Sequence, residues 1–150
     1  FFIWKSLAEV DTLPEVYSRG YSVLLDKDGL AGRIIPPTFR APPAERPSEA
    51  DFRRVVDQFW YAASEIARHI QRGNLWVVKA RDAAMKALLL TMIEWHAHAL
   101  HGWGYDTWHD GRFMLEWADS DVLRKVPGTF GQFGADDSWR ALLATMSPFR

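Results

Sequence analysis

Two groups of side chains have types and spacing that could support chemistry, and both lie in one apolar stretch. Glu94, His98 and His101 follow one another at steps of four and three residues, so a helix would place them on one face as candidate metal ligands. Structural zinc needs a fourth ligand, and the pattern lacks the tighter H-E-x-x-H spacing of catalytic sites. The alternative interpretation is a last helical turn, where the helix dipole favours histidine.

The second group is Lys79, Asp82 and Lys86, which also share one face of a helix. One interpretation is a solvated ladder of charges, worth a few tenths of a kcal/mol for each pair. The other is a stripe that faces a cleft, in which a lysine near a helix N-terminus suits a polyphosphate. The spacing leaves both interpretations open.

Composition excludes several classes of site. The chain of 150 residues has no cysteine, which excludes disulfides, thiolate catalysis and cysteine-based zinc sites and favours a cytoplasmic setting. A net charge of −1 predicts no general attraction to nucleic acid or to a membrane surface. The sequence contains no G-x-G-x-x-G, G-x-x-x-x-G-K-[ST], G-x-S-x-G or H-E-x-x-H motif, so no self-contained catalytic motif is present.

Both groups depend on a helix predicted over residues 74–102. Asn74 could cap its first turn by accepting an amide hydrogen bond, and Gly102 could adopt the left-handed conformation that ends a helix. Charges at several positions exclude a membrane span. Because the stretch is apolar on nearly every face, we expect a central core helix. The expected core residues are Leu88, Leu89, Leu90, Met92 and Ile93.

The neighbouring elements predict a mainly α fold, an up-and-down bundle of about five helices. Ser48 and Asp51 form a capping box ahead of an apolar pattern that runs to Ile70, and the short connection at Gly73 makes this helix antiparallel to the next. An aromatic loop follows Gly102. Three shorter helices are expected near 112–118, 121–126 behind a Ser120 cap, and 137–146.

The first third of the chain has a different pattern. Short apolar runs at 1–4 and 22–25, with a helix near 10–18 between them, predict a β-α-β remnant of another domain within residues 1–34. Residues 35–47 are rich in proline and predict an extended linker. Residues 48–150 would then form the helical-bundle domain.

Six segments in a specific order resemble the aminoglycoside 6-adenylyltransferase (streptomycin adenylyltransferase) family. They are LLDKDG at 24–29, RPSEADF at 46–52, FW at 59–60, LWVVKARD at 75–82, MIEWHAHALHGW at 92–103 and DTWHDGRF at 106–113. The resemblance extends from residue 1 to about residue 146.

The resemblance implies a two-domain enzyme that transfers AMP from ATP to a hydroxyl of an aminoglycoside. A nucleotidyltransferase domain would hold two Mg²⁺ ions with three carboxylates, and a helical bundle would close the cleft and bind the drug. The family's Gly-Ser and Asp-x-Asp motifs are absent here. We therefore expect a fragment that contains the substrate-binding part and only the tail of the catalytic domain, with no catalytic residue, no metal ligand and no activity alone.

The resemblance also assigns candidate site residues. Lys79 matches a bundle lysine that reaches the nucleotide phosphates, and Glu94 and Trp95 match the acidic and aromatic end of the helix that faces a cationic aminoglycoside. Asp106, in the aromatic loop, is a further acidic candidate for the drug. Two alternatives remain: a non-catalytic helical binding or dimerisation module, and a helical partner of a minimal nucleotidyltransferase.

Overall fold

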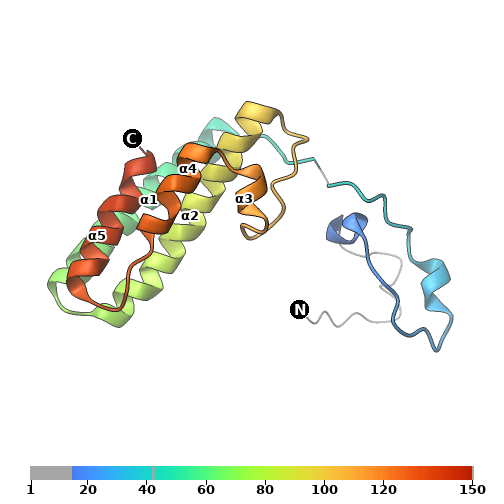
Figure 1. The fold of residues 1–150 in the computed structure, drawn as a ribbon, viewed down its shortest axis with the longest axis horizontal. Helices are drawn as coiled ribbons and strands as arrows, with labels where there is room; N and C mark the ends of the chain where they lie inside the picture. Colours follow the sequence, from blue (N-terminus) through green and yellow to red (C-terminus); the bar gives the residue numbers. More distant parts are fainter. Residues whose placement is uncertain (1–14, 42, 150) are drawn as a thin grey trace. The chain divides into compact units, whose positions relative to one another are not determined.

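The computed structural model describes residues 15–41 and 43–149, all of them in helices, turns or loops. The chain divides into two compact units, Phe1–Ala44 and Glu45–Arg150. The described part of the second unit contains the α-helices that Figure 1 labels. Their bounds are α1 Glu49–Gln71, α2 Leu75–His101, α3 Met114–Trp117, α4 Ser120–Lys125 and α5 Ala135–Met146.

An antiparallel pair of long helices, α1 and α2, forms the main body of the second unit (Figure 1). The predicted capping box is confirmed: Ser48 Oγ accepts a hydrogen bond from the Asp51 amide at 3.1 Å, and Asp51 Oδ2 accepts one from the Ser48 amide at 3.3 Å. Gly73 has a φ of +70°, which lets the chain reverse in a few residues. The predicted antiparallel neighbours are therefore present.

The core lies where α1, α2 and α5 meet. Phe59 and Ile66 of α1, Val78 and Met85 of α2, and Leu142 of α5 are almost inaccessible to solvent. Trp117 of α3 closes one end, and its indole N–H donates a hydrogen bond to the Arg112 carbonyl at 2.7 Å. The described residues form helices, with α5 packed on both long helices, so the prediction of a mainly helical fold is confirmed.

The extent of α2 agrees with the prediction, but its burial does not. Leu89 and Ile93 are buried, whereas the other three expected core residues, Leu88, Leu90 and Met92, are half-buried. Trp76 is 81% exposed. The prediction of a helix buried on nearly every face is wrong because α1 and α5 cover one side of α2, so a single stripe is enclosed.

The ends of α2 also differ in detail from the prediction. Asn74 has φ −81° and ψ 60° and forms no side-chain cap; its side-chain nitrogen instead lies 3.5 Å from His69 Nδ1. Gly102 does have a positive φ, +93°, with an extended ψ. The cap of α4 is Asp119 rather than Ser120, because Asp119 Oδ1 accepts a hydrogen bond from the Asp121 amide at 2.8 Å.

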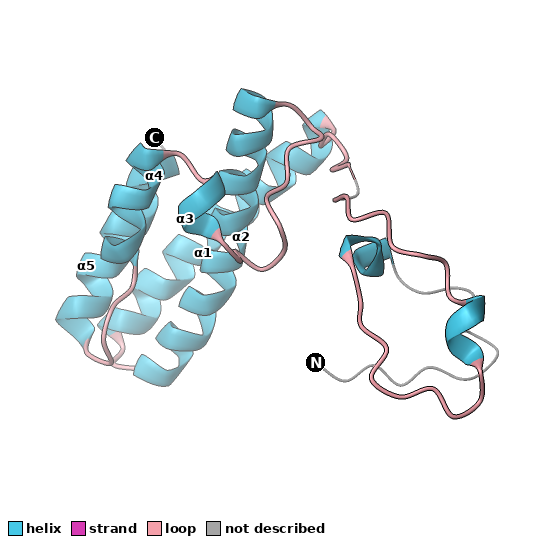
Figure 2. Cartoon of the chain, turned by 45° about the vertical axis from the view of Figure 1, so that its right-hand side comes forward, coloured by secondary structure: helices cyan, strands magenta, loops and turns pink. Residues whose placement is uncertain are grey.

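The first unit, in its described part, contains two short 3₁₀ helices, η2 Glu15–Arg19 and η3 Leu30–Arg33. Figure 2 shows helices and loops but no strand in the part of the chain that is described. The β-α-β prediction is therefore corrected: Ser22–Leu25 forms no strand, and the Leu24 side chain is 96% exposed. A strand needs a partner for its backbone groups, and none of the described residues supplies one. The run at 1–4 lies outside those residues.

Within 15–41 and 43–149, no helix has the length and hydropathy needed to cross a membrane.

Candidate functional site on helix α2

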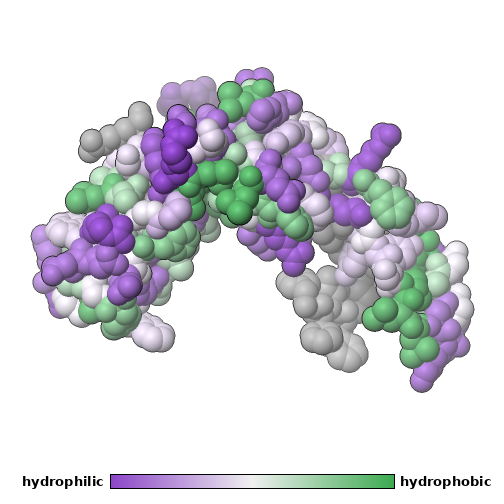
Figure 3. Space-filling view, viewed as in Figure 1, coloured by the Kyte–Doolittle hydropathy of each residue, from purple (hydrophilic) through white to green (hydrophobic). Residues whose placement is uncertain are grey.

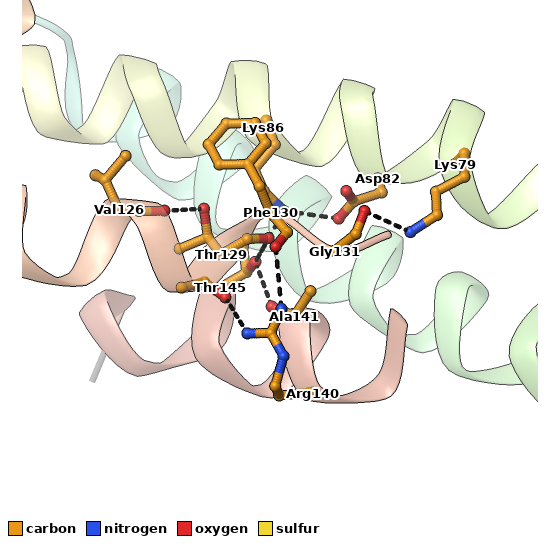
Figure 4. Close-up of polar contacts among 11 residues, drawn as sticks. Lys79, Asp82, Lys86, Val126, Thr129, Phe130, Gly131, Arg140, Ala141 and Thr145 are labelled. Carbon is orange, nitrogen blue, oxygen red and sulfur yellow. Dashed lines mark hydrogen bonds and ion pairs between the residues drawn. The ribbon is translucent and has the colours of Figure 1, made fainter. Parts of the chain in front are cut away.

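The Lys79, Asp82 and Lys86 stripe faces α5 and the segment 126–134 (Figure 4). Lys86 Nζ donates to Asp82 Oδ1 at 2.6 Å and to Thr145 Oγ1 at 2.8 Å. The i, i+4 ion pair of the charge ladder therefore forms. Its side chains are only 12% and 16% exposed, so the interpretation that these two residues are solvated is wrong. Burial lowers the pKa of Lys86, and the nearby Asp82 carboxylate opposes that shift.

Lys79 reaches a loop far along the sequence. Its Nζ donates a hydrogen bond to the Gly131 carbonyl at 3.0 Å. Gly131 allows the loop to pass this close to α5, because a Cβ atom there would lie 2.8 Å from the Asp137 carbonyl oxygen and 2.9 Å from the Ala141 Cβ. One of the three ammonium donors of Lys79 is therefore engaged in holding the loop against α2.

The same loop is held from the α5 side. Arg140 donates to the carbonyls of Gly128 and Phe130 at 2.8 and 3.0 Å and to Asp137 Oδ1 at 2.5 Å. Asp137 Oδ2 accepts the Gln132 amide at 2.6 Å, and the Arg140 hydrogen bond lowers the Asp137 pKa. These contacts fix the backbone around Phe130 between α2 and α5 (Figure 4).

Glu94 lies two turns beyond Lys86 on α2 and, unlike Lys86, has no partner of opposite charge among the described residues. The side chain is half-buried, and its carboxylate has no hydrogen bond or ion pair in the described ranges. Burial first, and the charge of Asp110 second, raise the pKa of Glu94 to about 7. Asp110 itself has a side chain 91% exposed and contacts His109 Nδ1 at 3.3 Å.

The four site residues predicted from the family resemblance are spread along α2 and the loop after it. The Trp95 ring packs on Phe52 of α1, with centroids 6.1 Å apart. Adjacent helical positions differ by 100°, so Glu94 and Trp95 leave the helix in different directions. Lys79 precedes Glu94 by 15 positions, which is about 22 Å along the axis. Asp106 Oδ1 accepts the Trp108 amide at 2.8 Å.

The histidines of α2 pack the aromatic loop onto the end of the helix. His98 is 4% exposed, stacks on Trp103 at 5.1 Å, and has its Nε2 atom 3.4 Å from Thr107 Oγ1. The His101 ring lies 4.5 Å from that of Tyr105. In the described part of the chain, no three His, Cys, Asp or Glu residues are grouped closely enough to hold a metal ion.

A cavity of about 310 Å³ lies against the middle of α2. Figure 3 shows hydrophobic residues gathered where α2 passes between α3 and α4. The cavity is lined by Lys86, Ala87, Leu89, Leu90, Ile93, Asp110, Gly111, Met114, Val126, Thr129 and Phe130. Sequence reasoning missed Asp110, Met114 and Phe130 as members of one site, because three separate segments supply the walls and no spacing within one helix indicates them.

The described part of the second unit is a helical domain with one cavity of about 310 Å³ described above, against α2. The chain belongs to the streptomycin adenylyltransferase family, whose model matches residues 4–150. This match confirms the family resemblance seen in the six sequence segments. A comparison with curated proteins found no match.

Proposed function

We propose that residues 48–150 form the acceptor-binding domain of an aminoglycoside adenylyltransferase-like protein, which transfers AMP from ATP to a hydroxyl of the drug. The family match supplies the reaction class. The observation that supports this domain's role is Glu94, a half-buried carboxylate with no cation beside it among the described residues. A polycationic ligand would provide the missing charge.

The candidate residues have distinct roles in this proposal. Glu94 and Asp106 pair with amines or guanidines of the drug, and the half-buried Trp95 indole covers a sugar face. Lys79, near the first turn of α2, uses its remaining donors on the nucleotide phosphates. In this proposal the nucleotide phosphates and the drug cations contact α2 at positions about 22 Å apart along its axis, so the two bound molecules must extend toward each other for the hydroxyl to reach the α-phosphorus.

In the proposed reaction, a drug hydroxyl oxygen attacks the α-phosphorus of ATP, and pyrophosphate leaves as its bond to that phosphorus breaks. The hydroxyl proton passes to a base that is not among the residues named here. The family implies ATP and Mg²⁺. The described residues offer no cluster that fits a metal ion, so no step on this chain is assigned to one.

Isothermal titration calorimetry of the full-length protein with streptomycin, and separately with a non-hydrolysable ATP analogue and Mg²⁺, tests the proposal. Lys79→Ala is expected to weaken nucleotide binding more than drug binding, and Glu94→Gln to do the reverse. Lys125→Ala and Glu116→Gln remove exposed charges of the same type and serve as matched controls.

Three results would contradict these assignments in different ways. Equal losses for both ligands in either variant would indicate a folding defect rather than a binding role. Control variants that behave like the site variants would show a general charge effect. A folded protein that gives no heat with streptomycin would remove the drug-binding proposal and favour the non-catalytic helical module.

A further inference from the structure

The walls of the α2 cavity come from three segments and are mostly apolar. Leu90 and Ile93 of α2, Met114 of α3, and Val126 and Phe130 supply most of the lining. The volume of about 310 Å³ is at the small end of ligand pockets and has room for a single substituted ring. A sugar ring inside it would leave several hydroxyls without hydrogen-bond partners, each at an energetic cost. The cavity therefore suits a compact apolar body.

The polar side chains of the lining are Lys86, Thr129 and Asp110. Thr129 is fully buried, and its hydroxyl donates a hydrogen bond to the Val126 carbonyl at 2.8 Å. An ionised carboxylate accepts hydrogen bonds and donates none, and the Asp110 side chain is in addition 91% exposed. Lys86 is therefore the side chain of the lining that can donate a hydrogen bond to a ligand inside the cavity.

Lys86 has one donor left for such a ligand. Its ammonium group has three protons, and the described contacts take two of them, to Asp82 Oδ1 at 2.6 Å and to Thr145 Oγ1 at 2.8 Å (Figure 4). The ammonium also lies 5.6 Å from the centroid of the Phe130 ring, which is another part of the lining. Because Asp82 balances the charge of Lys86, the cavity offers a hydrogen-bond donor without surplus positive charge.

We propose that this cavity binds a small uncharged aromatic molecule with one acceptor oxygen, such as an aryl ketone, which accepts a hydrogen bond from Lys86 Nζ. The ring packs against Leu90, Met114 and Phe130, and both the thioether of Met114 and the ring of Phe130 make favourable contacts with an aromatic group. The site rests on the lining and on the contacts of Lys86, and not on the assigned reaction or on the contacts proposed for the drug.

A carboxylate is the competing occupant, since it would accept the same hydrogen bond more strongly. It would, however, lie close to the Asp82 carboxylate, with which it would share one ammonium group. It would also lose its hydration among apolar side chains. An uncharged oxygen avoids both costs.

Three probes of nearly the same shape separate these occupants: acetophenone, its hydrocarbon counterpart α-methylstyrene, and benzoate. Binding to the full chain is followed by NMR of isotope-labelled methionine methyl groups. The chain has four methionines; Met114 lines the cavity, and Met92, which is outside the lining, is the internal reference. We expect both uncharged probes to shift the Met114 signal. Benzoate is expected to bind about tenfold more weakly than acetophenone, a factor equivalent to about 1.4 kcal/mol.

Variants locate the two halves of the site. Lys86→Met should weaken acetophenone about tenfold and leave α-methylstyrene unchanged, so that the hydrocarbon reports whether the cavity is intact. Leu90→Trp should fill the cavity and weaken both probes. Leu143→Trp, at an exposed position of α5 outside the lining, should alter neither. Circular dichroism of each variant verifies that it is folded.

The infrared stretch of the acetophenone carbonyl gives a readout that needs no variant. A hydrogen bond from an ammonium group weakens the C=O bond, so we expect a lower frequency in the complex than in an alkane solvent. A frequency equal to that in alkane would overturn the assigned hydrogen bond.

Other outcomes would overturn the proposal as a whole. They are tighter binding of benzoate than of acetophenone, a Met114 signal that neither uncharged probe moves, and undiminished binding in a folded Leu90→Trp variant. None of the probes carries a sugar or an amine, so these outcomes are independent of streptomycin binding.

Discussion

Charged side chains near the two ends of helix α2 differ in whether they have partners. Near the beginning, Lys79, Asp82 and Lys86 all have partners within the domain, and the Asp82–Lys86 pair is almost enclosed. Toward the end, Glu94 is half-buried without a partner in the described part, and its pKa is raised. Satisfied charges hold the fold together, whereas an unsatisfied one destabilises it unless a ligand supplies the opposite charge.

The sharpest test of the charges that have partners is Lys86→Met, which keeps most of the side-chain length and removes the charge. Asp82 would lose its cation in an enclosed site, whereas Thr145 would lose one donor and keep its hydrogen bond to the Ala141 carbonyl; we expect a loss of about 3 kcal/mol in the free energy of unfolding. Urea denaturation measures this loss.

The matched control for Lys86→Met is Arg53→Met. It breaks an exposed pair with Glu49, whose side chain is 78% exposed, and should change stability by less than about 1 kcal/mol. Similar losses in the two variants would show that the Lys86 pair is no more important than a surface pair.

Gly131→Ala tests whether the loop is held as closely as the contacts indicate. The added methyl group would overlap the Asp137 carbonyl and Ala141, so the loop must move away from α5. We expect a loss of about 2 kcal/mol in stability, as for other overpacked sites. Gly104→Ala, where a Cβ atom would meet nothing within 4 Å, is the control. An unchanged unfolding midpoint for Gly131→Ala would contradict the close packing.

Glu94→Gln tests the carboxylate without a partner near the end of α2, and it should raise the stability of the protein rather than lower it. The folded pKa of about 7 lies above the ordinary value of 4.5, so the native state binds the proton more tightly than the unfolded chain. Stability is therefore lost as pH rises from about 4.5 to about 7 and stays lower above that range. Removing the charge should stabilise the protein by about 1 kcal/mol at pH 8, after allowance for solvent screening.

Thermal unfolding of Glu94→Gln and of the unsubstituted protein at pH 4 and pH 8 checks this prediction. The two proteins should unfold nearly alike at pH 4, where the carboxyl is protonated in the folded state and mostly protonated in the unfolded chain. A variant that is less stable at pH 8 would mean that the Glu94 carboxylate already has a favourable partner.

The sequence predicted those features that depend on neighbours a few residues away. Ser48 and Asp51 satisfy each other within one turn, and Gly73 and Gly102 mark chain reversals through their own backbone freedom. The prediction from the Asn74 side chain was wrong. Asn74 has a suitable side chain but not the backbone conformation of an N-cap.

The partners of the charged stripe could not be predicted in this way. Lys79 and Lys86 meet Gly131 and Thr145, which are 52 and 59 positions further along the chain. Helical spacing shows that three charges share a face, but not whether that face meets water or another segment. The cavity has the same origin, since its lining comes from α2, the 110–114 turn and residues 126–130.

The sequence by itself determined the class of fold, the extent of the two long helices and the family to which the chain belongs. Helix periodicity and caps involve contacts within about four residues, so they can be predicted from the sequence. Only the tertiary structure decided which face of α2 is buried, because its apolar residues point in nearly every direction and the positions of α1 and α5 select among them. It also decided that the Lys86 charge is satisfied within the domain and that of Glu94 is not, since both outcomes depend on segments brought together by folding.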